Sequence, residues 1–195
     1  GRSGMVWLFD LDNTLHDAGA FVFPALKLSM RGYIQQQLQV DEAEAQRLNL
    51  QYWHRYGATL LGLMRHHGTD PDHFLVETHR FDRLHEMMVF ERALHGLLRR
   101  LPGRKIVFSN APRHYARAVL AVMGVDRLFE DGVGIEDLAY QPKPGIRAYR
   151  SLLHAQRLRP EQCIMPEDSA VNLRTAKRLG MRTVLVGGGL RTPAY

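Results

Sequence analysis

Short apolar runs alternate with longer amphipathic stretches along the chain. The first run, residues 5–9 (MVWLF), is continuously apolar and ends at Asp10. Similar runs occupy residues 105–108, 163–165 and 181–186, and each is followed by polar residues or glycines. Continuous apolar runs of this length are typical of strands that are buried on both faces of a sheet. We therefore predict a strand at each of these positions.

Helical patterns lie between the later strands. Residues 112–123 place apolar side chains on one stripe and are followed by Gly124, and residues 169–179 are closed by Gly180. Strand alternating with helix predicts an α/β fold with a doubly wound parallel sheet, Rossmann-like, whose ligand site lies at the carboxyl ends of the strands. The polar residues that follow each strand would then converge on one crevice.

The stretch between the first two strands lacks this alternation. It shows helical periodicity, and Asp41 with Glu44 resembles a capping pair at a helix start. We predict a core domain over 5–15 and 91–190, with an inserted helical cap over 16–90. Residues 1–4 are interpreted as an expression remnant and residues 187–195 as a flexible tail.

Composition and charge narrow the functional classes. Apolar residues make up 45% of the chain and charged residues 24%, which is ordinary for a globular protein. Lys and Arg exceed Asp and Glu by 26 to 20, which favours phosphorylated ligands. These cations are dispersed and no nucleic-acid-binding signature appears, so we expect a small-molecule partner and no nucleic acid.

Cysteine content and hydropathy indicate in which cellular compartment the protein is expected. Cys163 is the single cysteine, which excludes an intrachain disulfide and fits a reducing compartment. The sequence contains no apolar run long enough to span a membrane. We expect a soluble cytoplasmic protein without membrane contact, and its oligomeric state stays open between monomer and dimer.

Two carboxylates follow the first strand. Asp10 and Asp12 are two residues apart, so at a strand end their side chains leave on the same face. Like charges this close need a cation or a shared proton, and Mg²⁺ is the simplest oxygen-loving cation. An Asp-x-Asp pair also occurs in solvated turns, and its place directly after a buried strand favours the catalytic reading.

Residues 10–14 (DLDNT) resemble the first motif, DxDxT, of the haloacid dehalogenase superfamily. Ser109 in VFSNA resembles the second motif, Lys143 in QPKP the third, and Glu167-Asp168 the fourth. The resemblance covers nearly the whole chain, including a helical cap between the first two motifs. It implies a phosphomonoester hydrolase that uses Mg²⁺ and forms an aspartyl phosphate.

The resemblance also implies a role for each matched residue. Asp10 would be the nucleophile, and Asp12 would donate and then accept a proton. Mg²⁺ would be held by the Asp10 carboxylate, the Asp12 backbone carbonyl and Asp168. The phosphate group would contact Ser109, Asn110 and Lys143. Behind these, Glu167 would support the metal ligands. Asn172 lies four residues after Asp168, so on a helix it would share the face of Asp168 and orient its carboxylate.

Several of these residues have simpler readings. Ser109 or Asn110 could cap the helix that follows, Asn172 could be an ordinary surface residue, and Lys143 could be a solvated loop lysine. Lys143 precedes Pro144, where we expect a helix to begin, and a cation there opposes the helix dipole. Such a cation makes sense if it offsets carboxylates and phosphate.

A narrower resemblance is to the pyrimidine 5′-nucleotidase subfamily. It rests on the Ser-Asn-Ala of the second motif and on Tyr56-Gly57, Gly62-Leu63 and His66-His67. It implies UMP or CMP as substrate. Two candidate cap residues could contact the leaving group: His16, which follows the first motif where the cap begins, and Tyr56, whose ring could stack on a base or pack within the cap.

Three alternatives stay open beside the nucleotidase. The first is a sugar-phosphate phosphatase or phosphoglucomutase-like enzyme, and the others are a nucleic-acid-binding module and a catalytically inactive interaction protein. A dehalogenase is disfavoured, because that chemistry does not need the second acid, Asp12. Pro166 departs from the family pattern, and we expect it to disturb the strand before the fourth motif, since proline cannot donate a ladder hydrogen bond.

Overall fold

A computed structural model describes residues 4–130 and 132–187 of the chain. The predicted tail beyond Gly187, and residues 1–3 of the predicted expression remnant, lie outside these described residues. The described part divides into two compact units. We call residues 4–18 with 84–187 the core unit, and residues 19–83 the helical unit.

The unit borders differ from the predicted borders after residues 15 and 90. Residues 16–18 and 84–90 belong to the core unit. The backbone N–H of Asp17 donates to the carbonyl of Val89 at 2.7 Å, which ties these two segments to each other. His16, which we expected in the cap, therefore lies in the core unit.

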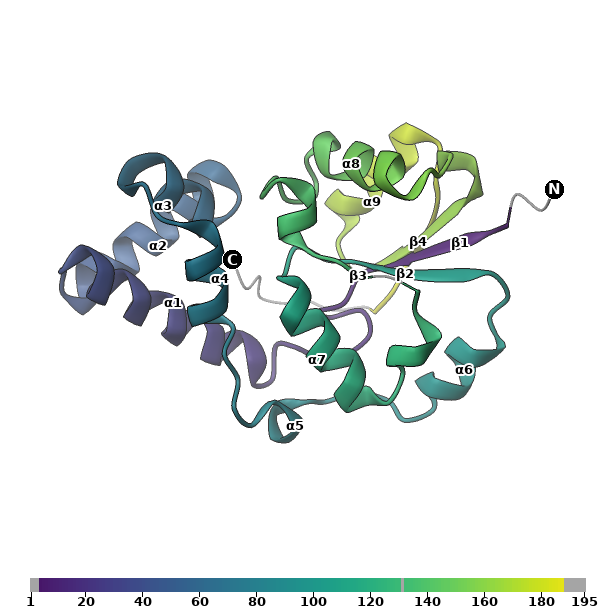
Figure 1. Ribbon diagram of the computed structural model, residues 1–195, viewed down its shortest axis with the longest axis horizontal. Coiled ribbons are helices and arrows are strands. Elements are labelled where there is room, and N and C mark those ends of the chain that lie inside the picture. Colours follow the sequence, from purple (N-terminus) through teal and green to yellow (C-terminus); the bar gives the residue numbers. More distant parts are fainter. Residues whose placement is uncertain (1–3, 131, 188–195) are drawn as a thin grey trace. The chain divides into compact units, whose positions relative to one another are not determined.

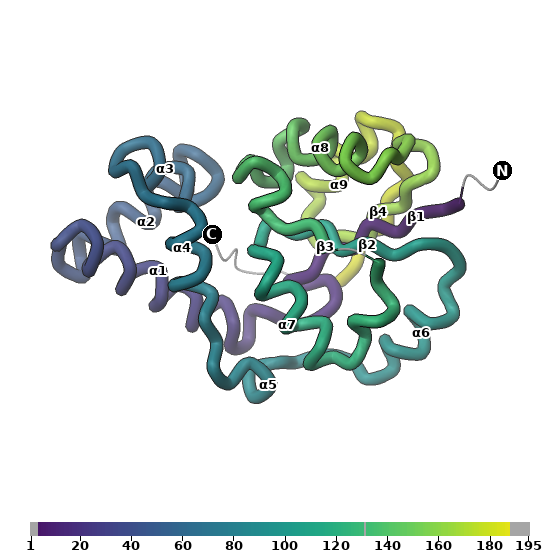
Figure 2. Tube along the Cα trace, in the orientation of Figure 1, coloured from purple at the N-terminus to yellow at the C-terminus, as the bar shows by residue number. Residues whose placement is uncertain are grey.

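The core unit contains a parallel five-stranded sheet in the order β3-β2-β1-β4-β5. This confirms the predicted doubly wound α/β class. Figure 2 follows the chain by colour and places the N-terminal strand within this sheet. The strands are β1 (Val6–Phe9), β2 (Arg104–Phe108), β3 (Gly132–Val133), β4 (Cys163–Glu167) and β5 (Arg182–Leu185).

Helices cover both faces of the sheet. Figure 1 shows α8 (Ile146–Gln156) and α9 (Ala170–Leu179) on one face, and α6 (Leu94–Arg100) and α7 (Arg113–Met123) on the other. The central strand β1 pairs with β2 on one side and with β4 on the other. Its position between two strands and two helical layers explains why its sequence is apolar without alternation.

Smaller elements complete the core unit. These are α5 (Leu84–Met87) and the 3₁₀ turns η1 (Asp126–Leu128), η2 (Ile135–Leu138) and η3 (Pro160–Gln162). The sequence reading missed β3, because two residues are too few to show a periodic pattern. It also started α8 at Pro144, which was wrong: the helix begins at Ile146, and Gly145 occupies its N-cap.

Pro166 lies within β4 and affects its two neighbours differently. Toward β5 the pairing continues through Pro166 and Glu167. Toward β1 the register ends at Ile164, and the next contact is a 3.3 Å hydrogen bond from the Asp10 N–H to the Pro166 carbonyl. The missing proline N–H thus loosens only the β1 side, next to Asp10.

The helical unit consists of α1 (Val22–Leu38), α2 (Glu42–Tyr56), α3 (Thr59–His67) and α4 (Pro71–Thr78). The Asp41 carboxylate caps α2 by accepting the backbone N–H of Glu44 at 2.8 Å, as the capping pattern predicts. Asp70 caps α4 in the same way through Asp72. Among the described residues, no helix has the length and apolarity that a membrane span requires.

Helices α2 and α3 pack through the residues that carried the narrower resemblance. Gly62 lies directly against the Tyr52 ring, so that a Cβ at this position would overlap the ring. The hydroxyl of Tyr56 lies 2.6 Å from Nε2 of His66, and that of Tyr52 lies 2.7 Å from Nε2 of His67. These residues therefore contribute to the packing of α2 against α3.

Candidate active site

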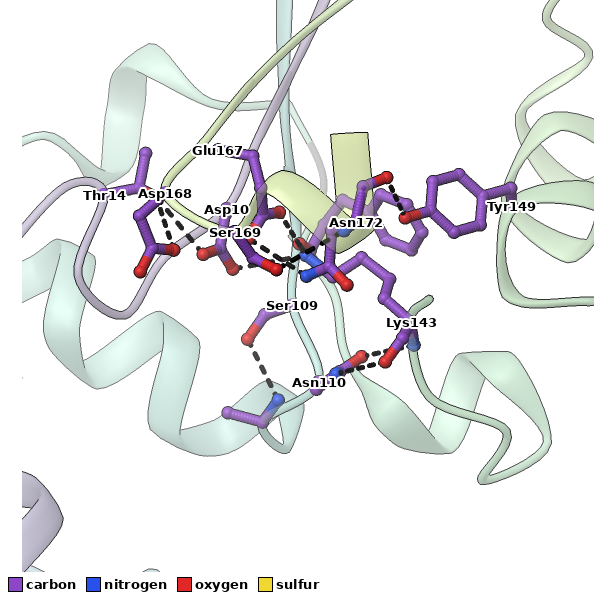
Figure 3. A network of polar contacts seen from close by, with 12 residues as sticks. Asp10, Thr14, Ser109, Asn110, Lys143, Tyr149, Glu167, Asp168, Ser169 and Asn172 are labelled. Carbon is purple, nitrogen blue, oxygen red and sulfur yellow. Dashed lines mark hydrogen bonds and ion pairs between the residues drawn. The ribbon is translucent and has the colours of Figure 1, made fainter. Parts of the chain in front are cut away.

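A buried ion-pair network occupies the carboxyl end of the central strands (Figure 3). Lys143 is only 4% exposed, and its Nζ lies 3.2 Å from Oδ1 of Asp10 and 3.0 Å from Oε2 of Glu167. The same ammonium donates to the backbone carbonyl of Phe108 at 2.6 Å. Lys143 is therefore a structural centre of the site and not a solvated loop lysine.

This network sets the charge state of Asp10. Burial alone would raise the pKa of the Asp10 carboxyl, but the positive charge of Lys143 and the surrounding hydrogen bonds outweigh it and hold this pKa below its usual value. Burial would lower the pKa of Lys143, and the charges of Asp10 and Glu167 raise it instead. Asp10 is thus kept as a buried carboxylate, the form that a nucleophile needs.

Asp168 lies beside Asp10, at the far side from Lys143. The hydroxyl of Thr14 donates toward both carboxylates, at 3.2 Å to Oδ2 of Asp10 and 3.5 Å to Oδ1 of Asp168. Burial and the negative charge of Asp10 raise the pKa of Asp168 to about 6. Positive charge at this position would relieve that repulsion.

The carboxylates of this end of the sheet fit a divalent metal. Oxygens of Asp10, Glu167 and Asp168 all lie within 4.8 Å of one another. Glu167 uses one oxygen for Lys143 and the other for the amide of Asn172 at 3.0 Å. Asp10 and Asp168 are therefore the carboxylates best placed to share a hard, oxygen-binding cation such as Mg²⁺.

Asn172 supports Glu167 and not Asp168, contrary to the sequence-based expectation. The expectation assumed that Asp168 and Asn172 share one face of a helix. Ser169 is the N-cap of α9, so Asp168 precedes the helix and the four-residue spacing does not apply. The backbone carbonyl of Asn172 also accepts the Tyr149 hydroxyl at 2.6 Å, which fixes the first turn of α9.

Asn110 holds the Lys143 segment against the end of β2. Its side-chain oxygen accepts the Lys143 N–H at 2.8 Å, and its side-chain nitrogen donates to the Lys143 carbonyl at 3.1 Å. The Asn110 amide is thus committed to positioning the lysine. Neither Asn110 nor Ser109 caps α7, because the N-cap is Pro112.

Ser109 is buried directly after β2. Its Oγ accepts the backbone N–H of Ala111 at 2.9 Å, and its own backbone N–H donates to Val133 in β3. A hydroxyl that accepts in this way still has its own hydrogen to donate.

Asp12 has surroundings unlike those of Asp10. Its Oδ1 accepts the hydroxyl of Tyr115 at 2.7 Å and lies 2.7 Å from Nε2 of His16. His16 is 3% exposed and Tyr115 2% exposed. The structure therefore corrects the assignment of His16 as a cap residue: the tight turn after β1 returns this side chain to Asp12, four residues earlier.

Tyr115 was missed as a site residue. The sequence analysis placed it on the apolar stripe of its helix, and most of its ring does pack there. The signal that could have found it is its place in the first turn of α7, directly after the β2 strand end, where side chains face the carboxyl edge of the sheet. Tyr56, by contrast, lies in the helical unit and bonds His66.

Comparisons with known proteins place these features in a family. The profile of the haloacid dehalogenase-like hydrolases matches residues 5–180. Phosphate metabolism protein 8 of Saccharomyces cerevisiae is 28% identical over 137 residues, which is 66% of this chain and 42% of the yeast protein. The chain thus spans less than half the length of that relative.

Solved structures share the fold at low sequence identity. A HAD phosphatase from Thermococcus onnurineus aligns with a TM-score of 0.62 at 19% identity, covering 96% of this chain and 89% of that one. An L-2-haloacid dehalogenase from Xanthobacter autotrophicus aligns with a TM-score of 0.58 at 16% identity, covering 93% and 77%. With the four motifs assembled at one sheet edge and the profile match over 5–180, the chain belongs to the haloacid dehalogenase-like hydrolase family.

Proposed function

We propose that the chain hydrolyses phosphate monoesters through a covalent phosphoryl intermediate on Asp10. The observation that carries this proposal is the contrast between two neighbouring carboxylates. Asp10 is held as an anion by Lys143, whereas Asp12 is held by hydrogen-bond donors. Hydrolysis of an ester through an enzyme carboxylate needs one group to attack and another to exchange protons.

In the first step, a carboxylate oxygen of Asp10 attacks phosphorus and the bond from phosphorus to the ester oxygen breaks. The departing oxygen takes the proton of Asp12 and leaves as an alcohol. In the second step, Asp12 accepts a proton from a water molecule, whose oxygen attacks phosphorus. The bond to Asp10 breaks, which releases inorganic phosphate and restores the Asp10 carboxylate and protonated Asp12.

Other residues of the chain orient the phosphate group and balance its charge. Ser109 retains a hydroxyl hydrogen for a phosphate oxygen, and Asn110 keeps Lys143 at the base of the site. Mg²⁺, when bound by Asp10, Asp168 and the Asp12 backbone carbonyl, would supply positive charge against the phosphate oxygens. Glu167 would stay with Lys143 and Asn172.

The presence of Asp12 favours phosphoryl transfer over dehalogenation. Displacement of a halide leaves an anion that needs no proton, so a positioned second acid would have no task. The yeast relative is named for phosphate metabolism, which agrees with this choice. The shared fold alone does not separate the two reactions, because the solved neighbours include both kinds of protein.

Among phosphate monoesters, we place pyrimidine nucleoside 5′-monophosphates first. This finer proposal rests on the subsidiary resemblance of the motif-two sequence and of residues 56–67. Since the Tyr56 hydroxyl is engaged by His66, any contact of Tyr56 with a base would be made by its ring face. Sugar phosphates are the alternative substrates.

The experiment is a hydrolysis panel with UMP, CMP, purine nucleotides, sugar phosphates and p-nitrophenyl phosphate. We expect activity with Mg²⁺, loss of activity in EDTA, and the highest kcat/KM for UMP or CMP. An Asp168→Asn variant should need a higher Mg²⁺ concentration for half of its maximal activity. Activity that persists in EDTA would contradict the metal assignment, and a preference for sugar phosphates would replace the nucleotidase assignment.

A second outcome would replace the enzyme assignment altogether. Suppose that no ester is hydrolysed and that the chain shifts a nucleic acid in a salt-dependent gel-shift assay. The function would then be nucleic-acid binding, supported by the net charge of +6. An inactive chain that shifts no nucleic acid would favour an interaction protein.

A further inference from the structure

The Asp12 carboxylate is held from one side. Tyr115 and His16 both approach the same oxygen, Oδ1, each at 2.7 Å. Among the described residues, Nδ1 of His16 is buried without a hydrogen-bond partner, and a ring hydrogen placed there would have no acceptor. The His16 hydrogen therefore lies on Nε2, from which it donates to Oδ1 of Asp12.

Both donors stand on rigid supports. Tyr115 belongs to the first turn of α7, and its ring is buried. His16 is fixed by the turn that leaves β1: the N–H of Asn13 donates to the His16 carbonyl at 2.8 Å, and the Asn13 side chain accepts the N–H of Ala18 at 3.0 Å. Asn13 adopts a left-handed backbone (φ 64°), which lets the turn close this tightly.

We infer that Tyr115 and His16 are positioning residues that select Oδ2 of Asp12 as the oxygen that exchanges protons. This inference rests on the proposed phosphomonoesterase function. With Oδ1 occupied by two donors, a proton on Asp12 resides on Oδ2. After the proton has gone to the leaving oxygen, the same two hydrogen bonds stabilise the negative charge that remains on the carboxylate.

The inference predicts that these residues matter most for leaving groups that need a proton. A nitrophenolate leaves as an anion, whereas an alcohol such as glycerol must be protonated as it departs. The quantity to compare is kcat/KM, since it reports the steps up to the first phosphoryl transfer and is not affected by later hydrolysis of the intermediate.

The experiment measures kcat/KM of Tyr115→Phe against the parent for p-nitrophenyl phosphate, phenyl phosphate and 2-glycerol phosphate. We expect a loss of about threefold or less for the nitrophenyl ester. For the glycerol ester we expect a loss of about tenfold to a hundredfold, the size of a hydrogen bond to a charged group. Phenyl phosphate should fall between them.

Matched variants separate positioning from folding. Tyr33→Phe removes the same hydroxyl from another Tyr–His pair, the 2.7 Å contact with His73 in the helical unit, and should leave the ratio between the esters unchanged. His16→Leu should reproduce the selective loss, and His16→Gln, which keeps a donor near the position of Nε2, should recover part of it. In an Asp12→Asn background, Tyr115→Phe should no longer change the ratio.

Two results would overturn the inference. Equal losses for all three esters in Tyr115→Phe would reduce Tyr115 to a packing residue. A ratio between the esters that Tyr115→Phe still changes in the Asp12→Asn background would show that its hydroxyl does not act through Asp12. In both cases the parent remains a phosphatase, so the proposed function stands. If the parent hydrolyses none of the esters, the proposed function fails and the inference fails with it.

Discussion

The core unit and the helical unit use polar side chains in different ways. In the core unit, charged groups that are almost fully buried contact one another at the strand ends, as Lys143 does with Asp10 and Glu167. In the helical unit, the hydroxyls of Tyr52 and Tyr56 contact His67 and His66 between two packed helices. The first arrangement holds buried charges in place at a candidate active site, whereas the second joins two helices.

This difference shows which motifs indicate chemistry. A buried charge is costly unless its partners are arranged around it, so Asp10 with Lys143 marks a site where function sets the sequence. A Tyr–His contact between two packed helices needs no such arrangement of charges and is compatible with packing alone. The buried ion-pair residues therefore indicate a chemical function, whereas the Tyr–His residues are explained by packing. Both groups nevertheless belong to recognisable sequence patterns.

The sharpest test of the comparison is Asp10→Asn. The amide keeps the shape of the side chain but cannot form the phosphoryl intermediate. We expect kcat for p-nitrophenyl phosphate to fall by about a thousandfold or more. Circular dichroism should show an unchanged fold. Near-parental turnover, with deamidation excluded by mass spectrometry, would place the nucleophile elsewhere.

Lys143→Met should cost the core unit most of its stability margin. It leaves Asp10 and Glu167 buried without their cation, and breaking a buried ion pair in this way costs about 3 to 5 kcal/mol. Urea unfolding with EDTA present would measure the change in the free energy of unfolding. A loss below about 1 kcal/mol, the value of an exposed ion pair, would mean that the network is solvated.

The loss in the free energy of unfolding caused by Lys143→Met should also depend on pH. In the parent, the folded pKa of Asp10 lies below its unfolded value, so the Asp10 ion pair contributes stability above the unfolded pKa and loses it as the pH falls through the folded pKa. The variant lacks this contribution and binds protons more readily when folded. The difference in the free energy of unfolding between variant and parent should therefore be largest near neutral pH and become smaller at acidic pH.

Two glycines test the packing side of the comparison. Gly62→Ala would push a methyl group into the Tyr52 ring and should destabilise the helical unit by about 1 to 3 kcal/mol. Gly32→Ala is the matched control, because a Cβ at Gly32 meets no atom within 4 Å and alanine favours a helix. We expect it to stabilise by about 0.4 to 1 kcal/mol. Equal effects in thermal unfolding would argue against the packing role of Gly62.

Asp41→Ala should have the smallest effect among the destabilising variants. It removes the carboxylate that accepts the Glu44 N–H at the start of α2, which is worth about 1 kcal/mol. The lower unfolding midpoint should come with unchanged kcat/KM for p-nitrophenyl phosphate. Asp41→Asn, which keeps an acceptor, should recover most of the loss, and a failure to recover would indicate that the charge and not the cap is responsible.

Sequence reasoning found the parts of the molecule that have a local signature. The buried strands are apolar without alternation, and the polar residues after them gave the convergence of Asp10, Ser109, Glu167 and Asp168 at one sheet edge. The capping role of Asp41 followed from its spacing to Glu44. In each case the physical cause acts within a few residues of the chain.

The parts that could not be predicted depend on contacts across long sequence distances. Tyr115 reaches Asp12, a residue 103 positions away, and the pattern of its own helix shows only an apolar stripe. The role of Asn172 depended on where α9 begins, which shifted its partner from Asp168 to Glu167. The pairing of Asn110 with the Lys143 backbone likewise spans 33 positions.

The central position of β1 has a consequence for how the molecule forms. Of the five strands this one is synthesised first, and its neighbours β2 and β4 begin only at Arg104 and Cys163. Until those segments exist, the apolar run that ends at Asp10 has no sheet to join. Closing loops this long slows folding far more than it weakens the final state. Until then the nascent chain carries this apolar segment without its sheet partners, and the candidate site at the end of β1 is assembled only when β4 has been made.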